Sequence, residues 1–210
     1  SNRRPDRNGP VTDDAYDTVG GRGEAAFEVQ GSEFIGHAEP VDTVDEAEAF
    51  VDEIRGEYPD ATHNVPAYRV RADPLREYSS DDGEPTGSAG KPMLNVLQMR
   101  ELENVAVVVT RYYGGTNLGV GGLARSYSQA VKDAVDDAGV VAERPHERVQ
   151  VVVDYDDSGT VRGIVESAGV EFDADYGERV RIDARVPVDD APGLRDRLRS
   201  ATSGRVEFED

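Results

Sequence analysis

The chain has 210 residues, which is enough for one domain or two small ones with a buried core. It contains no cysteine, so disulfides, thiol catalysis and cysteine-based metal sites are excluded. The three histidines lie far apart in the sequence, and we expect no metal site. No apolar run is long enough to span a bilayer, and the N-terminus lacks the apolar stretch of a signal peptide. We therefore expect a cytoplasmic protein without membrane contact.

The formal net charge is −20, from 43 acidic and 23 basic residues. Only Lys91 and Lys132 are lysines, and every other basic residue is arginine. This composition resembles that of cytosolic proteins from extreme halophiles, whose acidic surfaces preserve solubility in concentrated salt. In such salt the Debye length falls to about 3 Å, so repulsion between the protein and an anionic partner is largely screened. The net charge therefore does not exclude nucleic acid.

Residues 1–20 are polar, and we expect a flexible tail. Residues 26–41 then predict two paired strands around a turn at Gly31 and Ser32. Thr43 and Glu46 form a capping box for a helix that Pro59 ends. A strand near 65–71, a long loop and a helix near 89–99 follow. These elements belong to a first, mixed α/β domain over residues 21–142.

The most informative segment is 104–122, where an apolar strand, Val105–Val109, leads into polar and aromatic residues, a glycine-rich loop and a helix that ends at Gly139. This layout exposes backbone N–H groups at a helix N-terminus, where an anion can bind. In the alternative interpretation the glycines only permit positive φ angles and close packing. We favour a ligand or partner site, and its candidate residues are Lys91, Arg111, Tyr112, Tyr113, Gly114, Gly115, Asn117, Gly119, Gly121, Gly122 and Arg125.

A second motif covers residues 79–92 and contains many turn-forming residues, which predicts a rigid loop. It is not a P-loop, because Pro85 and Pro92 occupy two of its required positions. Its carboxylates could hold a divalent cation, but their spacing is not that of a calcium loop. We assign no metal, cofactor or catalytic residue, and we expect the nearby histidine to form structural hydrogen bonds. The candidate residues of this motif loop are His63, Asp81, Asp82, Glu84 and Gly87.

A second domain is predicted over residues 146–210, with the element order βαββαβ of a ferredoxin-like fold. The two strands of its central hairpin each have one apolar and one charged face, so helices should cover only one side of the sheet. The charged face lacks the aromatic residues on which RNA bases stack. We interpret it as a solvated surface, while contact with a protein through this face stays open.

The motifs at 32–35, 58–64, 80–92, 109–119 and 122–125 together resemble the YigZ/IMPACT family, in its prokaryotic two-domain type. The resemblance covers the chain after the tail. One departure is Val65, where many members have cysteine. The resemblance implies an α+β protein: an α/β domain like a ribosomal-protein domain, shared with GHMP-type kinases and elongation factor G, followed by the ferredoxin-like domain.

The resemblance also implies a link to translation, because eukaryotic relatives compete for the activator of a kinase that acts on an initiation factor. Our leading hypothesis is a non-enzymatic binding protein whose two motif loops form one surface for RNA, the ribosome or a translation-associated protein. A phosphate-bearing ligand is a further candidate for the same surface. The alternative is a phosphate- or nucleotide-handling enzyme in which Gly119–Gly122 cradle phosphates and Asp81, Asp82 or Glu84 binds magnesium or acts as the base. A third hypothesis is a protein adaptor that uses the C-terminal sheet.

Overall fold

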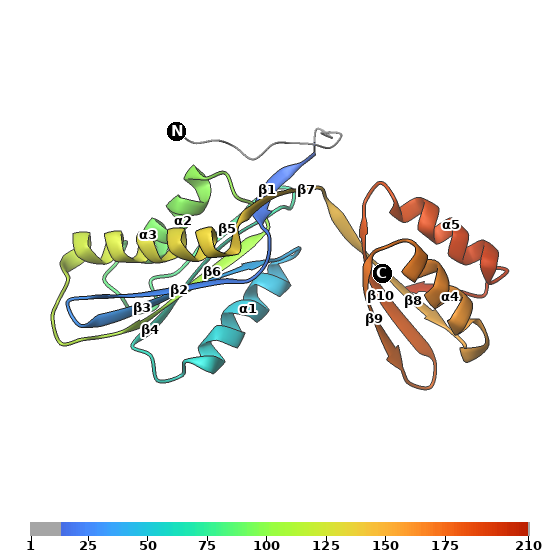
Figure 1. Cartoon of the computed structure of the whole chain (residues 1–210), viewed down its shortest axis with the longest axis horizontal. Coiled ribbons are helices and arrows are strands. Elements are labelled where there is room, and N and C mark those ends of the chain that lie inside the picture. The colour runs from blue at the N-terminus through green and yellow to red at the C-terminus, as the bar shows by residue number, and fades with distance from the viewer. Residues whose placement is uncertain (1–13, 210) are drawn as a thin grey trace. The chain divides into compact units, whose positions relative to one another are not determined.

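The computed structural model describes residues 14–209 and divides them into two compact units, with the boundary between Glu143 and Arg144 (Figure 1). The segment that we expected to be a flexible tail contains strand β1 (Tyr16–Val19). This strand pairs with β7 (Val140–Glu143), and Tyr16 and Val19 are buried. The tail prediction is therefore wrong for these four residues, while residues 1–13 lie outside the described part of the chain.

The first unit is built on a five-stranded antiparallel sheet with the order β2-β3-β6-β4-β5. The predicted hairpin is confirmed, and the short strand β5 forms inside the segment expected to be a long loop. The central strand is buried along nearly its whole length because both faces of the sheet are covered. The strands are β2 (Gly23–Val29), β3 (Ser32–Pro40), β4 (His63–Val70), β5 (Arg76–Ser79) and β6 (Val105–Tyr112).

Helix α1 (Val44–Glu57) covers one face of this sheet, and α2 (Gly90–Met99) and α3 (Gly119–Ala138) cover the other (Figure 1). The predicted N-cap of α1 is confirmed, since the Thr43 side chain accepts a hydrogen bond from the Glu46 N–H. Helix α3 lies directly on β3, where a Cβ atom at Gly36 would come within 2.3 Å of the Ala130 carbonyl oxygen. Glycine at this position allows the close approach.

Helices α2 and α3 pack side by side and run in the same direction. The Ser128 hydroxyl lies 3.4 Å from the Pro92 carbonyl oxygen. Eight residues further along both segments, Arg100 forms a 2.8 Å ion pair with Asp136. Because both contacts advance by the same number of residues, the helices are parallel. Their N-termini therefore point toward the same end of the sheet.

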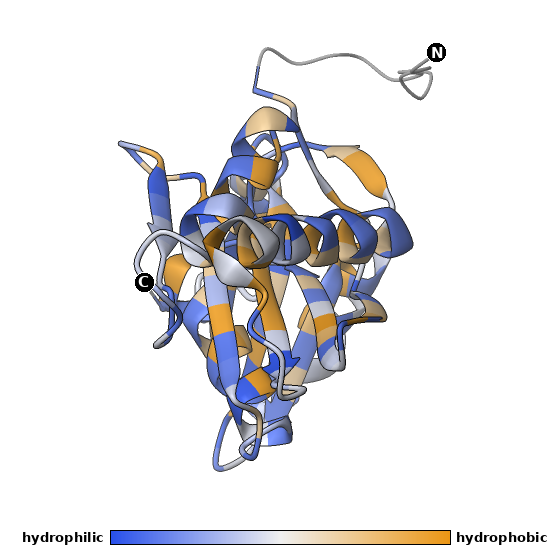
Figure 2. Ribbon diagram, turned by 90° about the vertical axis from the view of Figure 1, so that its left-hand side faces the viewer, coloured by the Kyte–Doolittle hydropathy of each residue, from blue (hydrophilic) through white to orange (hydrophobic). Residues whose placement is uncertain are grey.

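The second unit has the predicted element order βαββαβ, and its sheet has the order β11-β8-β10-β9. Both helices share one core with the apolar face of this sheet, as expected. Buried and more exposed residues alternate along the central strand β10. Figure 2 shows hydrophobic bands among hydrophilic ones along the ribbon of the chain. The elements are β8 (His146–Val153), α4 (Tyr155–Ser167), β9 (Glu171–Tyr176), β10 (Val180–Pro187), α5 (Ala191–Ala201) and β11 (Glu207–Glu209).

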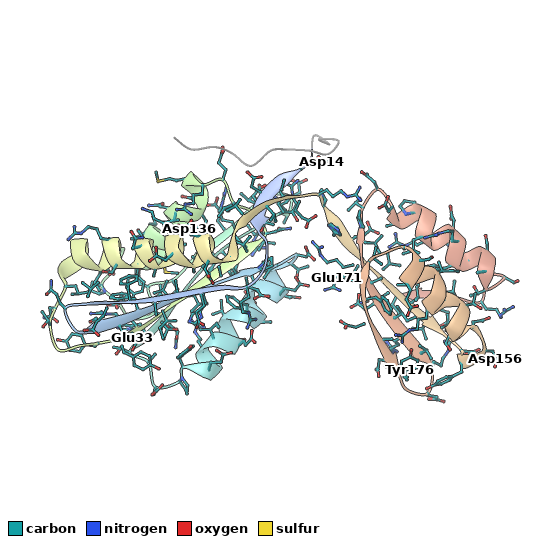
Figure 3. The ribbon with its side chains drawn as sticks, viewed as in Figure 1. Asp14, Glu33, Asp136, Asp156, Glu171 and Tyr176 are labelled. Atoms are coloured by element: carbon teal, nitrogen blue, oxygen red, sulfur yellow. The ribbon has the colours of Figure 1, made fainter. Side chains whose placement is uncertain are left out.

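The other face of this sheet carries paired charges. Arg181 forms a 2.8 Å ion pair with Glu209, and Arg148 lies 3.6 Å from Asp183. Figure 3 labels Glu171 at the start of β9, where it stands opposite Arg185 in the register. Opposite charges on neighbouring strands stabilise a sheet surface in water. The charged face is thus organised as a solvated ladder of ion pairs.

Candidate functional site

The two motif loops of the first unit meet at a buried ion pair. Arg111, at the end of β6, donates from Nη1 to Glu84 Oε1 over 2.6 Å. The Tyr127 hydroxyl, on α3, donates to the same oxygen over 2.6 Å. Only 3% of the Glu84 side chain and 6% of the Arg111 side chain are exposed. A strand, a loop and a helix that are distant in the sequence are therefore joined at one carboxylate.

We call Glu84, Arg111 and Tyr127 the buried cluster, and two aromatic rings lie beside its arginine. The guanidinium lies 5.6 Å from the ring centres of both Phe34 and Tyr113, which is within the range of cation–π attraction. Burial, together with the hydrogen bond to Glu84, raises the pKa of Tyr127, so this residue stays a donor. Removing Glu84 or Arg111 would leave the other buried charge without its partner, which is strongly unfavourable.

We expected Arg111 to face a bound anion, and the structure places it differently. Its Nη1 is bound to Glu84 and its Nη2 lies 3.3 Å from the Ser32 hydroxyl. Its Nε is buried without a hydrogen-bond partner among the described residues. The guanidinium is therefore committed to an internal ion pair. Arg111 holds the two loops together and does not present its charge to a ligand.

His63 extends the cluster toward the motif loop. Its Nδ1 lies 2.7 Å from the Asp82 carbonyl oxygen, and since a carbonyl only accepts, Nδ1 is the donor. Its Nε2 lies 3.7 Å from Glu84 Oε2. The Asp82 side chain accepts a hydrogen bond from the Asn64 N–H over 2.9 Å. These contacts match the structural role that we expected for His63, and they fix the motif loop against β4.

Asp81 caps helix α2. Its carboxylate accepts hydrogen bonds from the backbone N–H groups of Gly87, Ala89 and Gly90 over 2.9 to 3.2 Å. Burial raises the pKa of Asp81, but the three hydrogen bonds outweigh it and the net pKa is lowered. Because this carboxylate already occupies the helix N-terminus, no external anion is needed there.

The three acidic residues of the motif loop thus bind different internal donors. Asp81 binds the start of α2, Asp82 binds β4, and Glu84 binds Arg111 and Tyr127. Within residues 14–209 no group of three acidic or histidine side chains is arranged to hold a metal ion. This arrangement does not match the magnesium or catalytic-base role that the enzyme hypothesis gave to these carboxylates.

The glycine loop packs on the β2–β3 turn. A Cβ atom at Gly114 would lie 1.9 Å from the backbone carbon of Gly31, so only glycine permits this approach. The Tyr113 hydroxyl donates to Asn117 Oδ1 over 3.2 Å, and 48% of Tyr113 is exposed. Tyr112 donates to Asp60 over 2.9 Å. The loop is therefore anchored, with Tyr113 on its outer side.

Helix α3 begins directly after this loop, and its first turn has neither an acidic residue nor a side-chain cap. Gly115 and Gly119 adopt positive φ angles of 89° and 75°. Arg125 extends back along the first turn, where a Cβ atom at Gly121 would lie 3.3 Å from its Nη1. Arg125 and Lys91 are exposed, and neither forms an ion pair within the described residues. The predicted cations that remain available are thus Lys91 and Arg125.

Sequence reasoning missed several residues of the network. Tyr127 is absent from the candidate residues, although the hydroxyl of a buried tyrosine usually needs a partner. Ser32 accepts hydrogen bonds from Arg111 and from the Gly114 N–H. Thr110 donates to Asn64 Oδ1 over 2.7 Å and receives a contact from His37. Only the Tyr127 hydroxyl could have been suspected from its position in the sequence.

Among residues 14–209, none of the helices is long and apolar enough to cross a membrane. A model of the Impact N-terminal domain matches residues 30–135, and a domain of unknown function, DUF1949, matches residues 151–205. The chain is 33% identical to the IMPACT family member YvyE of Bacillus subtilis over 93% of its length and 91% of that protein.

It is also 44% identical to the IMPACT family member YigZ of Escherichia coli, over 51% of this chain and 54% of that protein. A crystal structure of a hypothetical protein aligns with a TM-score of 0.63 at 28% identity, over 93% of this chain and 96% of that one. The matches cover both units, and the chain belongs to the IMPACT family.

Proposed function

We propose that this protein is a translation-linked regulatory binding protein that contacts RNA, the ribosome or a translation-control protein through the motif loops of its first unit. Family membership supports this proposal, because the family resemblance implies a role in translation control. The observation that carries it is the buried cluster. Glu84, Arg111 and Tyr127 fix the two motif loops relative to each other, while Tyr113, Lys91 and Arg125 remain exposed.

This combination suits binding. A loop surface that is already rigid loses little conformational entropy when a partner docks on it. Tyrosine and arginine are among the residue types that most often anchor an interface. Lys91 and Arg125 form no ion pair within the described residues, so binding a partner's anionic group would break no internal pair. The first turn of α3 also favours negative charge nearby. The contacts would therefore be made to phosphate or carboxylate groups.

The fold assignments belong to this proposal as well. The order β11-β8-β10-β9 is the one expected of a ferredoxin-like sheet. We infer that the first unit resembles the ribosomal-protein-like domain of elongation factor G and GHMP kinases. We also infer that the protein works in the cytoplasm of a salt-adapted cell, given its acidic composition. Fold kinship alone does not establish function, so the exposed site residues carry the proposal.

The enzyme hypothesis loses its support, because the carboxylates that would bind magnesium are hydrogen-bonded internally. A thermal-shift experiment with nucleotides and magnesium tests it. Under the binding-protein proposal no nucleotide raises the melting temperature, whereas a shift that depends on magnesium would restore the enzyme hypothesis.

Cosedimentation with ribosomes in molar potassium chloride tests the proposal. The wild-type chain should sediment with ribosomes, and Tyr113→Ala and Arg125→Ala should each weaken binding by about tenfold or more, since loss of an interface anchor costs about 2 kcal/mol. Arg197→Ala, at an exposed position of α5, is the control and should bind normally. No sedimentation of the wild type, or equal binding by all variants, would contradict the proposal.

A further inference from the structure

Acidic residues are spread through this chain, but two long segments contain none. About one residue in five is Asp or Glu, yet neither type occurs from Pro85 to Arg100 or from Asn104 to Lys132. Burial explains this absence along β6. It does not explain the absence along α2 and the first two thirds of α3, because both helices expose one side to solvent. A surface free of acids is unusual in a chain with a net charge of −20.

The two exposed helix sides lie next to each other. The contacts of Ser128 with Pro92 and of Arg100 with Asp136 hold α2 and α3 side by side on one face of the sheet (Figure 1). Exposed residues recur every three or four positions along each helix, so they form one stripe per helix. We define the acid-free face by these residues: Lys91, Asn95 and Met99 on α2, and Arg125, Gln129 and Lys132 on α3.

The cations of the acid-free face lack ion-pair partners within the described part of the chain. Lys91, Arg125 and Lys132 form no ion pair there, whereas Arg22, Arg69 and most other arginines of the first unit do. The only two lysines of the sequence both lie on this face. No internal ion pair accounts for these cations, whereas a binding role does.

The apolar residues of the surface indicate the kind of partner. Met99 is 86% exposed and Val120, at the start of α3, is 58% exposed. Exposed methionine beside arginine is typical of the core of a protein interface. Nucleic acid would need a denser set of cations and stacked aromatic rings. At 1.5 Å per residue, α2 is about 15 Å long and the acid-free part of α3 is about 21 Å long. With a width of about 10 Å each, the two helices offer roughly 360 Å², a little under half of one side of a standard protein interface.

We propose that the acid-free face docks an acidic protein surface. Carboxylates of that partner pair with Lys91, Arg125 and Lys132, and its apolar side chains cover Met99 and Val120. The inference rests on the proposed function in placing the partner on the first unit. It goes further in choosing protein over RNA and in extending the contact from the glycine loop along both helices.

Fluorescence anisotropy with a labelled peptide of alternating Glu and Leu residues tests the inference on the full chain. The double variant Lys91→Glu/Lys132→Glu should bind this peptide at least tenfold more weakly than the wild type. The matched control is Arg76→Glu/Arg197→Glu, which changes the net charge equally at exposed positions outside the face and should bind normally. Equal losses in both double variants would show general repulsion and overturn the inference.

Acetylation of the lysines gives a second measurement that does not depend on a variant folding. Because Lys91 and Lys132 are the only lysines, their acetylation rates report on this face alone. The peptide should slow the acetylation of both. Unchanged rates, or protection by labelled poly(U) RNA in place of the peptide, would overturn the inference. Ribosome cosedimentation that depends on Tyr113 would then still support the proposed function, so the two failures are distinguishable.

Discussion

Arginine–carboxylate pairs occur in both units of this protein, in opposite surroundings. Arg111 and Glu84 lie 2.6 Å apart with 6% and 3% of their side chains exposed, whereas Arg181 and Glu209 lie 2.8 Å apart with 60% and 40% exposed. The distances are similar, so the surroundings decide what each pair does. The buried pair fixes the loops of the candidate site, and the exposed pair contributes to a solvated surface.

Removing the buried carboxylate should have the largest effect. Glu84→Ala leaves the Arg111 charge buried without a partner and should lower the free energy of unfolding by about 3–5 kcal/mol. Urea denaturation followed by circular dichroism measures it. Glu209→Ala removes the exposed partner of Arg181 and serves as the matched control. Similar losses from the two variants would show that burial does not distinguish the pairs.

The phenol of the cluster should contribute less than the carboxylate. Tyr127→Phe removes one hydrogen bond to a charged acceptor and should cost about 1.5–3 kcal/mol in the same denaturation experiment. Tyr58→Phe is the control, because its hydroxyl contacts Glu24 over 3.3 Å in an exposed position. An effect of Tyr127→Phe no larger than that of Tyr58→Phe would argue against the cluster as the point that fixes the loops.

The cap of α2 should contribute about 1–2 kcal/mol, with a defined pH dependence. The folded-state pKa of Asp81 is lowered, so its stabilisation is fully present above the ordinary aspartate pKa of about 3.9 and is lost as the pH falls through the lower folded value. The stability difference between wild type and Asp81→Ala should therefore be constant near neutral pH and shrink in acid. A difference that grows in acid would contradict this assignment.

The smallest effect is expected on the sheet of the second unit. Arg181→Ala breaks an exposed ion pair and should change the free energy of unfolding by less than about 1 kcal/mol. Added salt should reduce even this difference, because exposed charges are screened. A loss of several kcal/mol from Arg181→Ala would mean that the exposed ladder also acts as a structural framework.

Local patterns predicted the helices and most strands, whereas the meeting of the two motif loops was a hypothesis that no local pattern required. They did not predict strand β1, because its four residues include polar Asp17 and Thr18 and pair with a strand more than 120 residues away. They also assigned Arg111 to a ligand, since a charged residue at the end of a strand resembles a site residue. Its partner Glu84 lies 27 residues earlier, and no local pattern reveals that burial joins them.

We propose that binding belongs to the first unit and not to the charged sheet of the second. Ribosome cosedimentation of Arg125→Glu and Arg181→Glu, which make the same charge reversal in the two units, separates these possibilities. We expect Arg125→Glu to lose binding and Arg181→Glu to keep it. Loss of binding by Arg181→Glu together with full binding by Arg125→Glu would overturn this proposal.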